Sequence, residues 1–247
     1  IPLREEREFR SDVEELKEKF SPRTALIILN SPHNPTGGVL TQEDLEAVAE
    51  LAREYDAWVL SDEVYEKVLY QGKHASFLSL PQVADRTILL NGFSKTYAMT
   101  GWRLGYGVMP DELAEQMGKL MVNSNSCTAA FVQYAGIEAL QGPQEESARM
   151  VAAFRERRDV IVEGLNAIPG VRCLSPQGAF YVFPNIEGTG MSSKELEEYL
   201  LEEAGVATLS GTSFGEYGEG YLRLSYANSV ENIRTALARI GEALARR

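Results

Sequence analysis

The sequence predicts an α/β protein: a predominantly parallel sheet sandwiched by helices, followed by a smaller α+β C-terminal domain. One observation is that four short runs are continuously apolar and end at turn residues, which is typical of strands covered on both faces. These runs are residues 24–29, 57–60, 87–90 and 104–109. The second observation is that helical patterns separate the first three runs. Alternating strands and helices indicate a layered α/β architecture.

Helix starts are marked by capping residues. Thr41 can accept a hydrogen bond from the first turn of a helix whose apolar residues recur at helical spacing. Ser11 with Glu14, and Ser192 with Glu195, have the spacing of a capping box. We therefore expect helices to begin just after Ser11, Thr41 and Ser192.

The second half of the chain changes character. A long amphipathic helical stretch covers 143–168 and stops at Pro169 and Gly170. After this break we expect strands at 171–174, 179–183 and 221–226, and helices at 192–204 and from residue 229. The pattern predicts three parts: a large domain over 1–145, a long interdomain helix over 146–168 and a small domain over 169–247.

Composition favours a small-molecule ligand. The net charge of −12, with acids and bases interspersed, argues against nucleic acid or an anionic membrane as partner. The two cysteines and two histidines lack metal-site spacing, which predicts no metal and fits a reducing, cytoplasmic compartment. No apolar run approaches the roughly 18 residues of a membrane span.

Polar clusters follow three of the predicted strands. They are NSPHNPTGG at 30–38, SDEVY at 61–65 and GFSK at 92–95. Each cluster alone has a simpler explanation as a turn, a helix cap or a solvated lysine. Ligands of open α/β sheets bind at the carboxyl ends of the strands, however, and together the three clusters supply an amide, an acid, a phenol and an amine. We expect them to converge on one crevice.

Two other enzyme classes do not fit. The segment around Ser94 resembles the nucleophile elbow of hydrolases, but Thr96 stands where that motif needs its second glycine. The sequence also contains no phosphate-binding P-loop motif.

The motifs NSPHNPTGG, SDEVY, GFSKTYAMTGWRLGY and YLRLSYANS, in this order, resemble those of the fold-type I pyridoxal-phosphate aminotransferases. The likeness is to the class I/II branch that includes the aspartate and aromatic aminotransferases. It covers nearly the whole chain and implies the large domain of that fold, pyridoxal 5′-phosphate as cofactor, and amino acid and 2-oxo acid substrates.

The resemblance assigns the central chemistry to Lys95 and Asp62. Lys95 matches the lysine that binds the cofactor aldehyde covalently and later moves the substrate Cα proton. Such an amine must be neutral to attack, and a cationic or desolvated setting favours that form. Asp62 matches the acid that pairs with the pyridine nitrogen and keeps it protonated, which lets the ring accept electrons.

The remaining cofactor contacts follow from the same match. Tyr65 and Asn34 correspond to the two donors to the ring phenolate oxygen. Ser94 and Arg103 correspond to phosphate ligands, one a neutral donor and the other a charge-assisted fork.

Substrate contacts are assigned to Arg223 and again to Asn34. Arg223, in YLRLSYANS, matches the arginine that grips the substrate α-carboxylate. By itself an arginine in a strand is usually a surface ion-pair former, so only the resemblance makes Arg223 a ligand. Gly101 and Gly105 are interpreted as places where the backbone approaches closely.

Members of this family carry a further segment before the region that begins at Ile1, so the chain is interpreted as lacking the N-terminal part of the large domain. That segment supplies part of the phosphate loop, the aromatic that stacks on the ring, and a tyrosine that reaches the neighbouring site of a homodimer. We expect transamination between an L-amino acid and a 2-oxo acid, and the overall resemblance favours aspartate or an aromatic amino acid as the donor. The alternatives are β-elimination by a carbon-sulfur lyase and a non-catalytic cofactor-binding module.

Overall fold

The computed structural model describes residues 1–247, and the chain divides into two compact units. Unit 1 comprises Arg10–Pro32 and Val39–Arg149 together with Ile1. Unit 2 comprises Pro2–Phe9, His33–Gly38 and Met150–Arg247. Unit 2 draws on segments that are far apart in the sequence, whereas unit 1 is nearly continuous.

Unit 1 holds four strands and five helices together with three short 3-10 turns. Its strands are β1 (Leu26–Asn30), β2 (Trp58–Asp62), β3 (Thr87–Gly92) and β4 (Gly105–Val108). Its α-helices are α1 (Val13–Lys19), α2 (Gln42–Glu54), α3 (Phe93–Thr96), α4 (Asp111–Ser124) and α5 (Ala130–Gln141). The 3-10 turns are η2 (Phe77–Ser79), η3 (Pro81–Arg86) and η4 (Thr100–Trp102).

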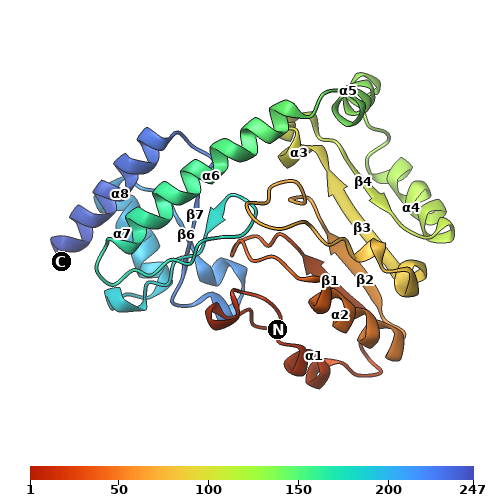
Figure 1. The fold of residues 1–247 in the computed structure, drawn as a ribbon, viewed down its shortest axis with the longest axis horizontal. Coiled ribbons are helices and arrows are strands. Elements are labelled where there is room, and N and C mark those ends of the chain that lie inside the picture. The colour runs from red at the N-terminus through yellow and green to blue at the C-terminus, as the bar shows by residue number, and fades with distance from the viewer. The chain divides into compact units, whose positions relative to one another are not determined.

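The four strands form one sheet in the order β1-β2-β3-β4 (Figure 1). The strands β1, β2 and β3 run parallel, with Asn30 opposite Asp62 and Asp62 opposite Leu90, whereas β4 is antiparallel to β3. Parallel neighbours need a crossover connection, and the segment containing α2 provides the one from β1 to β2. The predicted, predominantly parallel sheet is confirmed.

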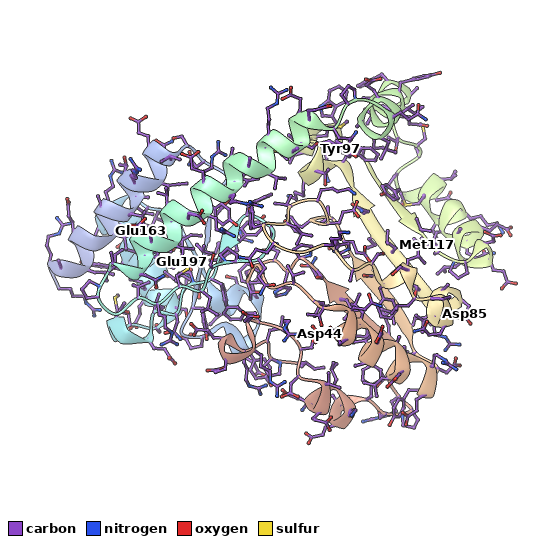
Figure 2. The ribbon with its side chains drawn as sticks, in the orientation of Figure 1. Asp44, Asp85, Tyr97, Met117, Glu163 and Glu197 are labelled. Carbon is purple, nitrogen blue, oxygen red and sulfur yellow. The ribbon has the colours of Figure 1, made fainter.

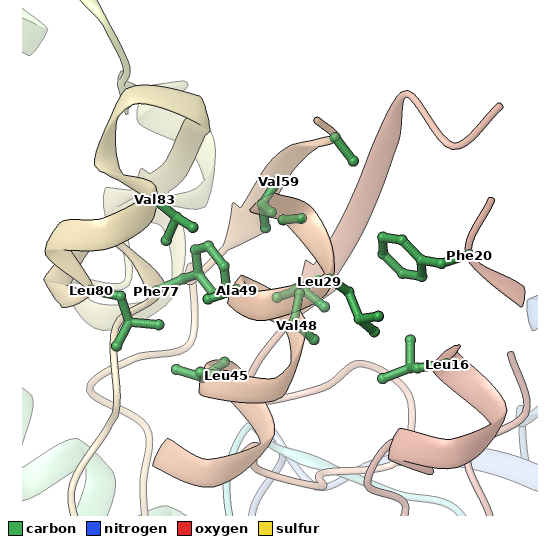
Figure 3. Packing of buried hydrophobic residues seen from close by; sticks show 13 residues of the cluster. Leu16, Phe20, Leu29, Leu45, Val48, Ala49, Val59, Phe77, Leu80 and Val83 are labelled. Atoms are coloured by element: carbon green, nitrogen blue, oxygen red, sulfur yellow. The ribbon is translucent and has the colours of Figure 1, made fainter. Parts of the chain in front are cut away.

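The core of unit 1 lies on one face of this sheet (Figure 3). Leu29 of β1 and Val59 of β2 pack with Leu45 and Val48 of α2, and Leu16 of α1 joins them. The segment after β2 contributes further apolar side chains, among which Phe77 and Val83 are fully buried. Full burial of one such side chain contributes roughly 1.5–3 kcal/mol.

The other face of the sheet is less covered. Leu26 and Ile28 of β1 are 44% and 67% exposed, and every residue of β4 is exposed. Successive side chains of a strand point to opposite faces, so the same strand that buries Leu29 presents Ile28 to the open side. The expectation that all four runs are covered on both faces is therefore wrong for β1 and β4, which form the two edges of the sheet.

Two of the predicted helix caps are confirmed. The Thr41 side chain accepts a hydrogen bond from Asp44 N, and the Asp44 carboxylate accepts one from Thr41 N at 2.8 Å. Asp44, at the start of α2, is marked in Figure 2. The Ser192 and Glu195 box is present at the start of α7 (Ser193–Ala204).

The cap of α1 differs from the prediction. Asp12, rather than Ser11, is the N-cap residue, and its carboxylate accepts hydrogen bonds from the amides of Glu14 and Glu15. A charged carboxylate is favoured at a helix N-terminus because the exposed amides there carry partial positive charge. The prediction from Ser11 and Glu14 therefore placed the start of this helix one residue too early.

Unit 2 contains a small antiparallel sheet and three main helices. The helix α6 (Glu145–Asn166) begins in unit 1 and continues into unit 2, and it confirms the long predicted helix. The strands are β5 (Tyr181–Val182), β6 (Leu209–Ser210) and β7 (Leu222–Ser225), in the order β5-β7-β6. The other two helices are α7 and α8 (Val230–Ala245). Unit 2 also contains the 3-10 turns η1 (Glu5–Arg7), η5 (Glu187–Thr189), η6 (Gly211–Phe214) and η7 (Glu216–Gly218).

One predicted strand of unit 2 does not form. Residues 171–174 make only an isolated bridge, in which Arg172 and Asn185 exchange backbone hydrogen bonds. The run of 179–183 is reduced to the two residues of β5. These are short apolar stretches, for which the sequence pattern alone gives poor boundaries.

The core of unit 2 is formed by buried side chains from its helices and strands. They are Phe154, Ile161, Leu196, Leu200, Leu222, Tyr226, Ile233 and Ile240.

Candidate functional site

The carboxyl ends of β2 and β3 bring two predicted site segments to one edge of the unit 1 sheet. β2 ends at Asp62, and β3 ends at Gly92 and passes directly into α3, which carries Ser94 and Lys95. Because the two strands are parallel neighbours, their ends meet at the same edge. Two of the three strand-end clusters therefore converge as expected, whereas the segment His33–Gly38 belongs to unit 2.

Asp62 is half-buried at this edge. Its carboxylate accepts a hydrogen bond from Val64 N at 3.2 Å, and its carbonyl oxygen accepts one from Asn30 Nδ2 at 3.1 Å. Burial raises the pKa of the Asp62 carboxyl above its ordinary value, the charge of Glu63 adds to this, and the bond from Val64 opposes it. A positive group placed beside Asp62 would favour its ionised form.

The structure places the Lys95 amine beside Tyr65. The Lys95 Nζ atom lies 5.8 Å from the centre of the Tyr65 ring, and Tyr65 is only 4% exposed. Tyr65 stands three residues after Asp62, on the turn that leaves β2. An amine, a phenol and a carboxyl thus occupy the strand ends of one unit.

Arg103 follows η4 in a left-handed backbone conformation with φ 57°. Its side chain is exposed, and Nη1 donates a hydrogen bond to Thr100 O at 2.9 Å. It also borders a cavity of about 420 Å³ whose polar lining includes Ser126 and Thr128. A guanidinium next to hydroxyl groups is a suitable environment for an anion.

The two glycines near Arg103 differ. A Cβ on Gly105 would lie 3.2 Å from Asn91 O, so the close backbone approach expected there is present. A Cβ on Gly101 would meet nothing within 4 Å. The prediction of close approach is therefore wrong for Gly101, which lies in an exposed turn with room for a side chain.

In unit 2 the structure joins Asn34 to Arg223. Arg223 Nη1 donates a hydrogen bond to Asn34 Oδ1 at 3.0 Å across 189 residues of sequence. The guanidinium carbon also lies 4.6 Å from the centre of the Tyr181 ring and 4.9 Å from that of Phe214. A guanidinium placed over aromatic rings is oriented by them and keeps its remaining N–H groups for other acceptors.

His33 and Thr36 fix the loop that carries Asn34. The amide of Gly38 donates to Thr36 Oγ1 at 3.2 Å, and Thr36 Oγ1 lies 2.8 Å from His33 Nδ1. The hydroxyl proton can therefore point at His33 Nδ1, which suits a neutral imidazole. Burial lowers the pKa of His33 to about 4. Gly37 is needed in this loop because a Cβ would lie 2.3 Å from Pro176 Cβ.

Three side chains that lie next to predicted site residues were missed by the sequence analysis. Tyr181 and Phe214 flank Arg223, and Glu63 makes a buried hydrogen-bond network next to Asp62. Nothing in the spacing of residues 181, 214 and 223 indicates that they meet. Glu63 did carry a signal, because a second acid directly after a buried strand needs partners of its own.

The donor set of unit 1 fits pyridoxal phosphate. The cofactor presents an aldehyde, a basic ring nitrogen, a phenolate oxygen and a phosphate. The strand ends offer an amine, a carboxyl whose pKa is raised and a phenol, and the same unit offers the Arg103 guanidinium beside a separate cavity. Fold and side chains together define a protein of the pyridoxal-phosphate-binding α/β class.

Comparison with known proteins identifies the family. The model of the aminotransferase class I and II family matches residues 1–240. The aspartate aminotransferase of Pyrococcus horikoshii is 47% identical over 99% of this chain and 63% of its own length, and the aromatic-amino-acid aminotransferase 2 of Thermococcus litoralis is 44% identical over the same shares. A solved aromatic aminotransferase from Pyrococcus horikoshii superposes with a TM-score of 0.97 at 43% identity, covering 100% of this chain and 67% of that one.

The chain belongs to the class I and II aminotransferases, whose members use pyridoxal phosphate. It spans about 63% of the length of these curated relatives. No helix in the structure combines the length and apolar character needed to cross a membrane.

Proposed function

We propose that the protein catalyses the reversible transfer of an amino group between an L-amino acid and a 2-oxo acid. The observation that supports this proposal is the 5.8 Å distance from Lys95 Nζ to the centre of the Tyr65 ring, with Asp62 at the end of the neighbouring parallel strand, in a chain of this family. Names of the relatives support aspartate or an aromatic amino acid as substrate.

When bound, the cofactor would supply an electron-accepting ring for the charge left on the substrate Cα. Lys95 would hold it covalently in the resting protein, and its Nζ would then take the proton from the substrate Cα. Asp62 would hold the ring nitrogen in its protonated form. Tyr65 and Asn34 would donate hydrogen bonds to the ring oxygen, and Ser94 and Arg103 would bind the phosphate.

Arg223 and Asn34 would bind the substrate carboxylate. The guanidinium already has one N–H bonded to Asn34 and two rings that fix its plane, so its other N–H groups can form a two-bond fork with a carboxylate. Fixing the carboxylate restricts rotation about the bond to Cα, which aligns the Cα proton for removal.

Assembly, location and domain limits also remain proposals. Exposed apolar side chains on α4 and α5, among them Val122, Phe131 and Tyr134, support a homodimer. Free Cys127 and Cys173 support a reducing, cytoplasmic compartment. We retain 1–145, 146–168 and 169–247 as the proposed large domain, interdomain helix and small domain.

The function is tested by adding pyridoxal phosphate and then L-aspartate, L-tyrosine or L-cysteine to the protein. Transamination converts the cofactor to its amine form and releases one 2-oxo acid per cofactor, which chromatography and absorbance measure. Pyruvate released together with ammonia and sulfide from cysteine would instead indicate β-elimination. If the protein takes up the cofactor but forms neither product, it is a non-catalytic cofactor-binding module, and the proposal is contradicted.

A further inference from the structure

A buried carboxylate next to Asp62 has no part in the chemistry described above. Glu63 directly follows β2, and only 1% of its surface is exposed. Burying a charged carboxylate is costly unless hydrogen bonds replace its lost water. The partners of Glu63 therefore show what keeps it in this position.

Four donors surround the Glu63 carboxylate. Its Oε1 atom accepts from Ser61 Oγ at 2.9 Å, from Phe77 N at 3.0 Å and from Ser76 Oγ at 3.1 Å. Its Oε2 atom lies 2.7 Å from His74 Nε2. Ser61 belongs to β2, whereas the other three donors lie where the chain returns to the core. Glu63 thus ties together the two ends of the loop from 63 to 77.

The protons in this network are fixed by the surroundings. His74 Nδ1 is buried and has no hydrogen-bond partner. A proton on Nδ1 would be a buried donor without an acceptor, whereas a proton on Nε2 is donated to Glu63, so the Nε2 tautomer is favoured. Burial by itself raises the pKa of the Glu63 carboxyl. The hydrogen bond from His74, the positive charge of that ring when it is protonated, and the bonds from Phe77 and Ser76 outweigh burial and hold the pKa below its ordinary value. Glu63 therefore acts as an acceptor for all four groups.

The tied loop begins with the turn that carries two proposed cofactor contacts. Val64 N donates to Asp62 Oδ1 at 3.2 Å, and Glu66 N donates to Glu63 O at 2.9 Å. Tyr65 lies between these two bonds. Glu63 therefore stands in the backbone between Asp62 and the turn that carries Tyr65, and its carbonyl oxygen closes that turn.

We propose that Glu63 is a positioning residue, whose carboxylate, held by His74, Ser76 and the Phe77 amide, fixes the turn that presents Asp62 and Tyr65. The inference rests on the proposed function, in which those two side chains hold the cofactor. It requires no contact between Glu63 and the cofactor, because Glu63 lies on the core side with Phe77 while Asp62 is half-buried at the sheet edge.

A metal ion is the competing explanation for the same cluster. Ligand atoms of Glu63, Glu66 and His74 lie within 4.8 Å of one another, which is close enough to surround a cation. Both oxygens of Glu63 already accept from protein donors, however, and the His74 nitrogen nearest to it would have to lose its proton to bind a metal. We assign the hydrogen-bonded anchor, and the experiment separates the two.

Amide hydrogen exchange of the protein without cofactor tests the anchor. His74→Ala should speed exchange at Val64, Glu66 and Phe77 by about tenfold or more, because one lost hydrogen bond to a charged group lowers local stability by roughly that factor. Ser76→Ala, which removes one of three donors to Oε1, should have a smaller effect at the same amides. His74→Gln should restore protection, since its amide nitrogen can donate from nearly the same place.

Val83→Ala is the matched control, because it weakens the same core without touching the network. If His74→Ala speeds exchange evenly over unit 1, as this control does, Glu63 is only a core residue and the proposal fails. Added Zn²⁺ should leave the wild-type exchange rates unchanged. If these amides are protected from exchange only when Zn²⁺ is present, the cluster is a metal site and the proposal fails.

Cofactor titration followed by absorbance then links the anchor to the site. His74→Ala should raise the dissociation constant of pyridoxal phosphate about tenfold, and His74→Gln should lower it again. Equal affinity of wild type and His74→Ala would overturn the positioning role alone. A wild-type protein that takes up no cofactor would overturn the proposed function, while the exchange rates would still decide whether Glu63 anchors the turn.

Discussion

The proposed cofactor contacts of unit 1 and the proposed substrate contacts of unit 2 are built in different ways. Asp62 and Lys95 stand where parallel strands end, so the sheet itself sets their positions. Arg223 lies inside the antiparallel strand β7, and the rings of Tyr181 and Phe214 with the amide of Asn34 orient it. A strand end positions a side chain through the backbone, whereas a strand interior needs neighbouring side chains to do so.

The comparison leads to a separation of roles: changes at the strand ends of unit 1 should affect the cofactor, and changes at Arg223 of unit 2 should affect the substrate, with Asn34 assigned to both. Lys95→Ala tests this most strongly. It should abolish the cofactor adduct that borohydride traps, because no other amine replaces Nζ beside Tyr65. Mass spectrometry of the reduced, digested protein measures the adduct, and Lys119→Ala on exposed α4 is the control. An adduct that persists on another lysine would show that the site is misassigned.

Asp62→Asn should keep the covalent adduct but slow amino-group transfer by about a hundredfold or more, since a neutral amide cannot hold the ring nitrogen protonated. Single-turnover absorbance after adding amino acid measures the rate, and borohydride trapping measures cofactor content. Unchanged transfer with full cofactor content would mean that Asp62 does not face the ring nitrogen.

Arg223→Lys should weaken substrate binding by roughly 10- to 100-fold, because lysine cannot make the planar two-bond fork. The dissociation constant of pyridoxal phosphate should stay within about twofold of the wild type, since Arg223 is assigned to the substrate carboxylate and to no cofactor atom. Titrations with the cofactor and with an unreactive dicarboxylate measure the two affinities. A loss of cofactor binding equal to the loss of substrate binding would break the division of roles.

The smallest effect is expected at the loop of Asn34. The pKa of His33 is about 4 in the folded protein, below the ordinary value of 6.5, so between these pH values the unfolded chain binds the extra proton. The free energy of unfolding should therefore fall as the pH drops from 6.5 towards 4, by at most about 3 kcal/mol from this group. Urea unfolding at several pH values measures it.

His33→Gln should remove this part of the pH dependence, because glutamine does not titrate and can still bond to Thr36. The difference between the wild-type and variant curves isolates the contribution of His33 from that of the carboxyl groups. Parallel curves would show that His33 is protonated at the same pH in the folded and unfolded chains.

Much of the fold followed from local patterns. The parallel strands, the caps at Thr41 and Ser192 and the long helix α6 were predicted, since each depends on residues close together in the chain. The failures were at residues 171–174, which form only a bridge, and at the cap of α1, where adjacent polar residues compete. The exposed faces of β1 and β4 were missed because an apolar run looks the same whether or not another element covers it.

The sequence by itself placed an acid, a phenol and an amine just beyond strand ends, and through the family motifs it assigned them to pyridoxal phosphate. Only the tertiary structure decided which side chains hold them: His74 on Glu63, and Asn34 and two aromatic rings on Arg223. The reason is physical. Strand ends and caps are set by neighbouring residues, whereas a hydrogen bond across 189 residues exists only once the chain has folded and brought its two groups to 3.0 Å.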